Sequence, residues 1–175
     1  MLDLLLKRRS RRKFKPLEVE QEKIEYILKC ALLSPTSQNR RCWEFVAVTE
    51  PERLAALAEA KERGSQFLQE APLAVVVFAD TGKSNYWVED CSIASIIIQL
   101  AAETLGLGSC WIQIRGRFAA GNTSSGEYVK KVLNIPEQYD VECIIAIGYP
   151  DEEKEPYSVD NLDYNKIHYN VYQDR

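Results

Sequence analysis

Residues 73–80, LAVVVFAD, are apolar almost without interruption and follow directly on Pro72. A strand with one face in water alternates apolar and polar side chains, whereas a strand that is buried on both faces does not need to. The stretch therefore predicts a central strand that is covered on both sides, around which the other elements are arranged.

Further strands and helices are expected on either side of this stretch. The strands are expected at residues 43–49, 109–114 and 141–147. The helices are expected at 1–9, 20–33, 51–61, 88–105 and 126–133, with a short helical stretch near 65–70. Gly106 is placed to cap the helix at 88–105, and Ser125 can cap the helix at 126–133. Helices interleaved with four strands indicate one α+β domain over residues 1–175.

The predicted helix at 88–105 has almost no polar face. Ala94, Ile97 and Ala101 lie on one side of it, while Ile93 and Ile96 extend the apolar surface around the helix. A helix that is apolar nearly all round is buried. In a chain of 175 residues, the expected way to bury it is against a partner subunit as well as against its own sheet.

The C-terminal segment is acidic and rich in tyrosine, and it shows no helical period. Such aromatic content is unusual for a disordered segment. We therefore expect residues 156–175 to pack on a surface, that of the partner subunit.

The composition argues against several classes of protein. A net charge of −4 and a pI near 5.2 argue against a dedicated nucleic-acid-binding protein, which would be basic overall. Gln99 and Glu103 interrupt the longest apolar stretch, so no membrane span is expected. Five cysteines without C-x-x-C spacing or a secretory signal fit a reducing, cytoplasmic setting. A single histidine, His168, leaves little material for a zinc centre or a Ser-His-Asp triad.

A cationic segment, residues 7–14 (KRRSRRKF), stands out from this acidic background. Seven of the first fifteen residues are basic, whereas the other 160 residues hold 15 basic and 25 acidic ones. Such a patch implies an anionic partner or ligand. In an extended backbone Arg8, Ser10 and Arg12 share one face, and two guanidinium groups flanking a hydroxyl suit a terminal phosphate.

Three interpretations of this segment remain open on charge alone: a solvated face, a nucleic-acid arm or localisation signal, and a phosphate clamp. The segment follows a leucine-rich turn and ends in Phe14 and Pro16, which favours an ordered element that is docked on the core. Neither G-x-G-x-x-G nor G-x-x-x-x-G-K-[ST] is present. A cationic clamp would therefore have to bind the phosphate that a glycine-rich turn binds in other proteins.

Four segments, taken in order, resemble the FMN-dependent nitroreductase family of NAD(P)H-dependent flavin oxidoreductases. They are residues 8–14 (RRSRRKF), 34–43 (SPTSQNRRCW), 105–111 (LGLGSCW) and 144–150 (IIAIGYP). The resemblance implies a three-layer α/β/α fold with a mixed, mostly antiparallel central sheet flanked by helices. It also implies an obligate homodimer with FMN bound at the subunit interface.

The resemblance also implies which residues contact the flavin. The phosphate and the pyrimidine side would be held by Arg8, Arg9, Ser10 and Arg12. The other subunit would contribute Pro35, Thr36, Ser37 and Asn39. The strand end formed by Gln113, Ile114, Arg115 and Gly116 would run beside the isoalloxazine, with a main-chain N–H of Arg115 or Gly116 directed at N5. No metal is implied, and no side chain is assigned a catalytic role.

The implied activity is electron transfer from NAD(P)H, as co-substrate, to a small electron-poor acceptor of the nitroaromatic or quinone type by a ping-pong mechanism. The cofactor carries the chemistry in such enzymes, and the protein supplies binding and electrostatics. The alternatives are different flavin chemistry, such as dehalogenation or flavin breakdown, and a non-enzymatic FMN-binding or redox-sensing protein. Nucleic-acid and membrane partners are not expected.

The sequence departs from the family pattern at three places. Cys42 stands where a proline commonly precedes the tryptophan, and Arg115 stands where some members have an acid. Many members place a basic residue after the last strand, for which Lys154 and Lys166 are the candidates here. Two further expectations concern single positions: Arg11 and Lys13 are solvated, and Asp90 is a capping or polar position at the start of the long helix.

Overall fold

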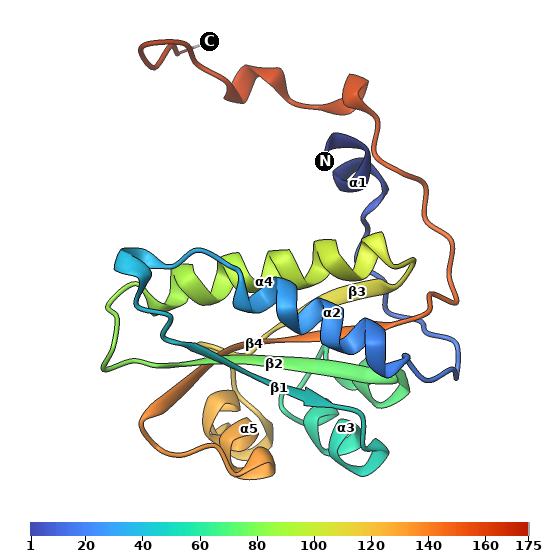
Figure 1. Ribbon diagram of the computed structural model, residues 1–175, viewed down its shortest axis with the longest axis vertical. Helices are drawn as coiled ribbons and strands as arrows, with labels where there is room; N and C mark the ends of the chain where they lie inside the picture. The colour runs from blue at the N-terminus through green and yellow to red at the C-terminus, as the bar shows by residue number, and fades with distance from the viewer. Residues whose placement is uncertain (175) are drawn as a thin grey trace.

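The computed structural model describes residues 1–174, and its centre is a four-stranded antiparallel sheet (Figure 1). The strands are β1 (Trp43–Val48), β2 (Leu73–Asp80), β3 (Gly108–Gln113) and β4 (Tyr139–Gly148), in the order β1-β2-β4-β3. All three neighbouring pairs are antiparallel, and a parallel backbone bridge joins Ser10 to Ser109 at the edge of β3. The predicted α+β class is confirmed.

Helices cover both faces of the sheet, as a three-layer fold requires (Figure 1). The α-helices of the chain are α1 (Leu2–Lys7), which lies apart from the sheet, and α2 (Gln21–Leu32), α3 (Pro51–Ala58), α4 (Trp87–Thr104) and α5 (Ser125–Leu133). α2 and α4 lie on one face, and α3 and α5 lie on the other. None of the described helices is long and apolar enough to cross a membrane.

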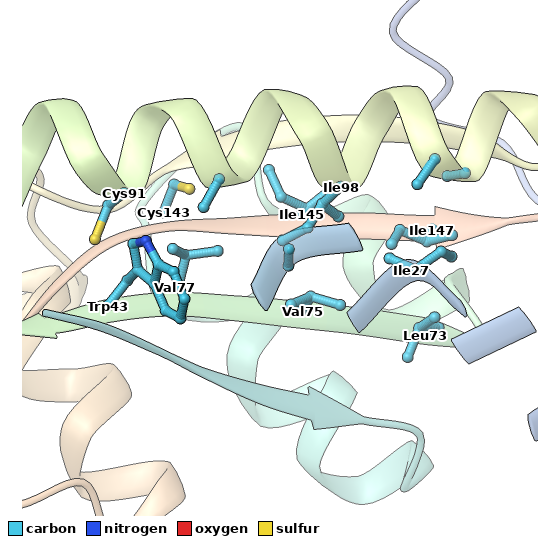
Figure 2. Close-up of a cluster of buried hydrophobic side chains, with 14 of the residues drawn as sticks. Ile27, Trp43, Leu73, Val75, Val77, Cys91, Ile98, Cys143, Ile145 and Ile147 are labelled. Atoms are coloured by element: carbon cyan, nitrogen blue, oxygen red, sulfur yellow. The ribbon is translucent and has the colours of Figure 1, made fainter. Parts of the chain in front are cut away.

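The apolar run 73–80 is explained by this layering. Leu73, Val75 and Val77 point into the core beneath α2 and α4 (Figure 2), while Ala74 and Val76 point into the core beneath α3 and α5. Both sets are fully buried. Because successive side chains of a strand point to opposite faces, a strand between two helical layers needs apolar residues at every position.

A β-bulge interrupts the pairing of β2 with β4 near one end of the sheet. Val77 pairs with Cys143 and Phe78 pairs with Val141, so Glu142 is the extra residue on β4. Bulges bend a strand and re-aim a side chain. Here the bulge leaves the buried carboxylate of Glu142 beside the C-terminal end of β3.

α4 is buried on one side only within a single chain. Ala94, Ile98 and Ala102 are in the core, whereas Ile93 and Ile96 are each 37% exposed. The expectation that a partner subunit covers the outer side of this helix is consistent with these exposed isoleucines and remains a prediction.

α1 and the start of the C-terminal segment lie side by side, away from the sheet (Figure 1). The N–H of Tyr157 donates to the carbonyl of Leu6 at 2.8 Å, and the Arg9 guanidinium lies 4.5 Å from the centroid of the Tyr157 ring. Beyond this anchor the large apolar side chains of the tail are exposed. They are Val159, Leu162, Tyr164, Ile167, Tyr169, Val171 and Tyr172. The last residue of the segment predicted to pack on a partner, Arg175, lies outside the described residues.

Most predicted element boundaries lie within a few residues of those observed, with one wrong cap. Gly106 has a φ of +74° directly after the α4 C-cap, as the capping prediction requires. Ser125 does not cap α5. The N-cap is Ser124, Ser125 is the first helical residue, and its buried hydroxyl has no partner among the described residues.

Candidate functional site

The cationic segment is extended and lies along the edge of the sheet. Ser10 forms the bridge to Ser109 at the start of β3, and the N–H of Arg11 donates to the Ser109 carbonyl at 2.9 Å. Four residues later Phe14 forms a second bridge, to Pro150. The segment therefore has the extended conformation in which Arg8, Ser10 and Arg12 share one face and alternate with their neighbours.

The arginines of this segment have different partners. Arg8 Nη1 donates to Gln99 Oε1 at 3.3 Å, and Arg9 donates to the carbonyl of Glu155. Arg12 makes no side-chain hydrogen bond or ion pair with any described residue, and its guanidinium lies 6.0 Å from the centroid of the Phe67 ring. Arg12 thus carries an exposed charge that is free to bind an anion.

Arg11 is not simply solvated, contrary to the sequence-based expectation. Its Nη1 donates to the carbonyl of Glu152 at 2.7 Å. Its aliphatic stem packs on Gly108, where an added Cβ would lie 2.7 Å from Arg11 Cγ. The glycine is needed because the arginine stem lies so close to the backbone of β3. Lys13 is exposed, as expected.

Lys154 is the basic residue from beyond the last strand that reaches the cationic segment. Its Nζ donates to the carbonyl of Ser10 and lies 3.3 Å from Glu152 Oε2. Burial raises the pKa of Glu152, but the N–H groups of Arg12 and Lys13 and the charge of Lys154 more than offset this, so the net pKa is lowered. Lys166, in contrast, pairs with Asp163 in the exposed tail.

The loop 34–39 is held by its own turns and by one buried carboxylate. Ser37 and Asn39 lie in a short 3-10 turn in which Gln38 and Asn39 have φ values of 52° and 55°. The Ser37 N–H donates to Asp90 Oδ1 at 2.8 Å, and the Thr36 hydroxyl accepts from the Arg41 N–H at 3.0 Å. These contacts stabilise a backbone conformation with positive φ at Gln38 and Asn39, which residues other than glycine adopt only at a cost.

Asp90 is more than a polar position at the start of the long helix. Its side chain is buried, and its Oδ2 accepts weaker hydrogen bonds from the Cys42 thiol and the Ser84 hydroxyl, each at 3.4 Å. Burial, followed by the nearby Asp90 carboxylate, raises the pKa of Cys42 to about 11. Cys42 is therefore protonated and donates a hydrogen bond in this network. The cysteine that stands in place of the family's usual proline is thus held by Asp90.

The end of β3 provides one free backbone donor. The N–H groups of Ile114 and Arg115 both donate to the carbonyl of Glu142, at 3.2 and 3.1 Å. Gly116 has a φ of +69°, and its N–H makes no hydrogen bond to a described residue. Of the two N–H groups predicted to face a flavin, Arg115 already has a partner and Gly116 remains available.

The side chains at this strand end are also ordered. Gln113 Oε1 accepts from Trp111 Nε1 at 2.9 Å, while its amide donates to Glu142 Oε1 at 3.3 Å. Arg115 Nε lies 2.8 Å from Glu142 Oε2. Ile114 is fully buried and cannot present its side chain to a ligand. Among these four residues, the groups left available to a ligand are the N–H of Gly116 and the exposed part of Arg115.

The twelve predicted site residues fall into two groups within one chain. Residues 8–12 and 113–116 lie along β3 and just beyond its end. The loop 34–39 is attached to α4 through Asp90, and no hydrogen bond or ion pair in the described part of the chain joins it to the other group. Its expected place at a site of the partner subunit remains a prediction.

Sequence reasoning missed a further segment, residues 61–67, between α3 and β2. Phe67 lies beside the Arg12 guanidinium, and the Glu62 N–H donates to the Phe118 carbonyl at 3.2 Å. This segment therefore lies between Arg12 and the turn after β3. Its sequence, KERGSQF, carries no motif that would have indicated this position.

The sequence and the fold of this chain are both similar to those of known proteins. A model of the Nitroreductase family matches residues 5–66 and 50–149. An FMN-dependent nitroreductase structure from Clostridium difficile R20291 superposes with a TM-score of 0.96 at 50% identity, covering 98% of this chain and 100% of that chain.

Two curated relatives extend the comparison. A protein of Archaeoglobus fulgidus with the provisional name NADH dehydrogenase/NAD(P)H nitroreductase is 37% identical over 164 residues, which cover 91% of each chain. An iodotyrosine deiodinase of Thermotoga neapolitana is 26% identical over 181 residues, covering 90% of this chain and 92% of the relative. Relatives of this fold therefore carry names for more than one reaction.

Proposed function

Because the chain belongs to the nitroreductase family, we propose that it is an FMN-dependent oxidoreductase that moves electrons from NADH or NADPH to a small electron-poor acceptor. The observation that carries this proposal is the arrangement at the start of β3. There the extended Arg-Ser-Arg-Arg segment carries the unpaired guanidinium of Arg12, and the ammonium of Lys154 binds the carbonyl of Ser10. Nitroaromatics and quinones are the acceptor class that we propose.

The residues present fit the chemistry of FMN. A phosphomonoester needs several cationic donors, which Arg8, Arg9, Arg12 and Lys154 can supply as charge-assisted hydrogen bonds. The Ser109 hydroxyl, which is buried and has no partner among the described residues, lies on the strand position that pairs with Ser10. These donors form the proposed phosphate site.

The chain's own contribution to the reaction is electrostatic. When bound, FMN supplies the chemistry of hydride and electron transfer. The cationic segment would also offset the negative charge that a reduced flavin carries on its pyrimidine side, as preorganised donors do in an oxyanion hole. The free N–H of Gly116 is the proposed donor to the flavin edge, because the Glu142 carbonyl holds the two preceding N–H groups and leaves this one without a described partner.

We propose that the active form is a homodimer with a complete site only at the interface. Supporting this, α4 exposes Ile93 and Ile96, and the tail exposes a series of apolar and aromatic side chains beyond Tyr157. Surface of this kind is typical of an interface. The loop 34–39 would then reach the partner's flavin from its Asp90 anchor, and residues 156–175 would pack on the partner.

We also propose a reducing, cytoplasmic setting. The five cysteines are all free, and all except Cys30 are buried. Burial raises the pKa of the Cys91, Cys110 and Cys143 thiols, so these side chains behave as small apolar residues rather than as reactive thiols.

Initial-rate kinetics test this function. The proposed ping-pong mechanism predicts parallel double-reciprocal lines when NAD(P)H and a quinone or nitroaromatic acceptor are varied together. Intersecting lines would contradict the ping-pong step. Iodide release from an iodotyrosine at a higher kcat/KM than any quinone or nitroaromatic would favour dehalogenation, the alternative that the deiodinase relative suggests.

A further inference from the structure

A hollow of about 470 Å³ lies beside the turn that follows β3, and cationic side chains dominate its lining. It is formed by two short segments of the chain, residues 61–63 and 116–118. The segments are tied together because the Glu62 N–H donates to the Phe118 carbonyl at 3.2 Å, and the turn is closed by the bond from the Arg117 N–H to the Ile114 carbonyl at 3.0 Å. The hollow therefore has an ordered frame.

The three cations of the lining, Lys61, Arg63 and Arg117, are unpaired. None of their charged atoms takes part in a hydrogen bond or ion pair with any residue among 1–174. Glu62, the acidic residue of the lining, forms no ion pair with them either. Elsewhere in this acidic chain many cations have a carboxylate partner, such as Lys23, Arg53 and Lys130.

Lys61 and Arg117 also lie close enough to repel one another. The pKa of Lys61 is lowered, first because the side chain is partly buried and second because Arg117 is nearby. Three cations around one hollow that holds a single carboxylate, itself not ion-paired with any of them, leave an excess of positive charge that an anion would neutralise. Unpaired cations around a hollow are typical of a binding site for an anion.

The hollow adjoins the proposed reaction centre. Gly116, whose free N–H we assign to the flavin edge, is also part of the lining. A molecule whose reactive part lies over the flavin could therefore place a substituent in this hollow without leaving the flavin.

We propose that Lys61, Arg63 and Arg117 form a subsite for an anionic group, a phosphate or carboxylate, on a substrate of the flavin. This inference rests on the proposed function. Two sources supply such a group: the ribose 2′-phosphate of NADPH, and a carboxylate on the electron acceptor. Either one would be selected over the corresponding neutral molecule by charge-assisted hydrogen bonds.

Equilibrium titration calorimetry on the FMN-loaded protein separates these sources. One pair of probes is 2′,5′-ADP and 5′-AMP, and the other is benzoate and benzamide. In wild-type protein the anionic member of at least one pair is expected to bind roughly tenfold more tightly than its counterpart, the scale of one charged hydrogen bond. The pair that shows the preference identifies the source.

The double variant Lys61→Gln/Arg117→Gln is expected to abolish that preference, while Arg117→Lys retains part of it. Lys131→Gln, which removes an exposed cation of α5 instead, is the matched control and should leave the preference intact. The proposal is overturned if wild-type protein shows no preference in either pair, or if the double variant keeps the preference.

Failure of the subsite and failure of the proposed function give different results. If the flavin is not reduced by either nicotinamide but the charge preference is present and is lost in the double variant, the subsite stands and the oxidoreductase assignment falls. If the flavin is reduced and no preference exists, the subsite alone is wrong.

Discussion

Glu142 and Arg115 form an ion pair of 2.8 Å between a buried carboxylate and a half-exposed guanidinium. Glu142 reaches this position because it is the extra residue of the β-bulge in β4, and its carbonyl binds the N–H groups of Ile114 and Arg115. One residue thus orders both the backbone and the side chain at the end of β3. The resulting turn leaves the Gly116 N–H free.

Arg115 and Glu142 are expected to be energetically coupled. Arg115→Met leaves the buried carboxylate with only the Gln113 amide as a side-chain partner, and it should lower the free energy of unfolding by about 1 kcal/mol because half of the arginine is solvated. In the double variant Arg115→Met/Glu142→Gln the loss should be smaller than the sum of the single losses, by roughly 0.5–2 kcal/mol. Urea unfolding of the four proteins measures this cycle, and additive losses would show that the pair is not coupled.

Arg12 and Lys13 provide a matched test of the proposed phosphate and pyrimidine contacts. Both are exposed neighbours in the same segment, but the Arg12 guanidinium faces Phe67, and only Arg12 is assigned to FMN. Arg12→Ala should weaken FMN binding by roughly 1.5–3 kcal/mol, whereas Lys13→Ala should change it little. Titration of the apoprotein by flavin fluorescence quenching measures both. Equal affinities in the two variants would refute the assignment.

Lys154 should matter for FMN in a way that Lys166 does not. Lys154→Met removes the ammonium that contacts the Ser10 carbonyl and Glu152, while Lys166→Met removes a cation of the exposed tail. We expect the first variant to release FMN about tenfold more readily, and the second to retain it. Because FMN and riboflavin differ in the phosphate, riboflavin affinity should be the same in wild-type and Lys154→Met protein; a parallel loss of riboflavin affinity would indicate a general disruption.

Asp90 is expected to act as a positioning residue for the loop 34–39. Asp90→Asn weakens the acceptor for the Ser37 N–H and the Cys42 thiol, at a cost of about 1–3 kcal/mol. Hydrogen exchange should show faster exchange of the Ser37 amide in this variant. Glu89→Gln, one residue earlier and exposed, is the control. Unchanged Ser37 protection in Asp90→Asn would show that the loop is held by other contacts.

The raised pKa of Cys42 predicts its reactivity. A thiol with a pKa of about 11 is protonated at pH 8 and becomes a thiolate only as the pH rises toward that value. At pH 8 a disulfide reagent should therefore modify native protein rapidly at Cys30, which is partly exposed, and should modify Cys42 only after unfolding. Rapid native-state labelling of Cys42, read by peptide mass spectrometry, would contradict the buried network around Asp90.

The core of the fold could be predicted from the sequence because its signals are local. The apolar run at 73–79 indicates a doubly covered strand by itself, and the largely apolar run at 141–147, which Glu142 interrupts, indicates a buried strand; the structure contains both as central strands. The Ser125 cap failed because adjacent serines offer two capping positions, and the sequence does not say which one the backbone uses.

The site was predicted less completely because its contacts join distant residues. Arg11 and Arg12 are alike in sequence, but a carbonyl of Glu152 binds Arg11 and leaves Arg12 free. The contact of Lys154 with Ser10 spans 144 residues, and that of Asp90 with Ser37 spans 53. Charge and spacing could identify the cationic segment, whereas only the folded chain separates its free cations, Arg12 among them, from its bound ones.

Anaerobic mixing of the FMN-loaded protein with NADH and, separately, with NADPH tests the central claim most directly. The account predicts that at least one nicotinamide bleaches the flavin absorbance, and that a quinone added afterwards restores it. If FMN is bound but neither nicotinamide bleaches it, the protein binds flavin without being an NAD(P)H oxidoreductase, and the proposed function is wrong.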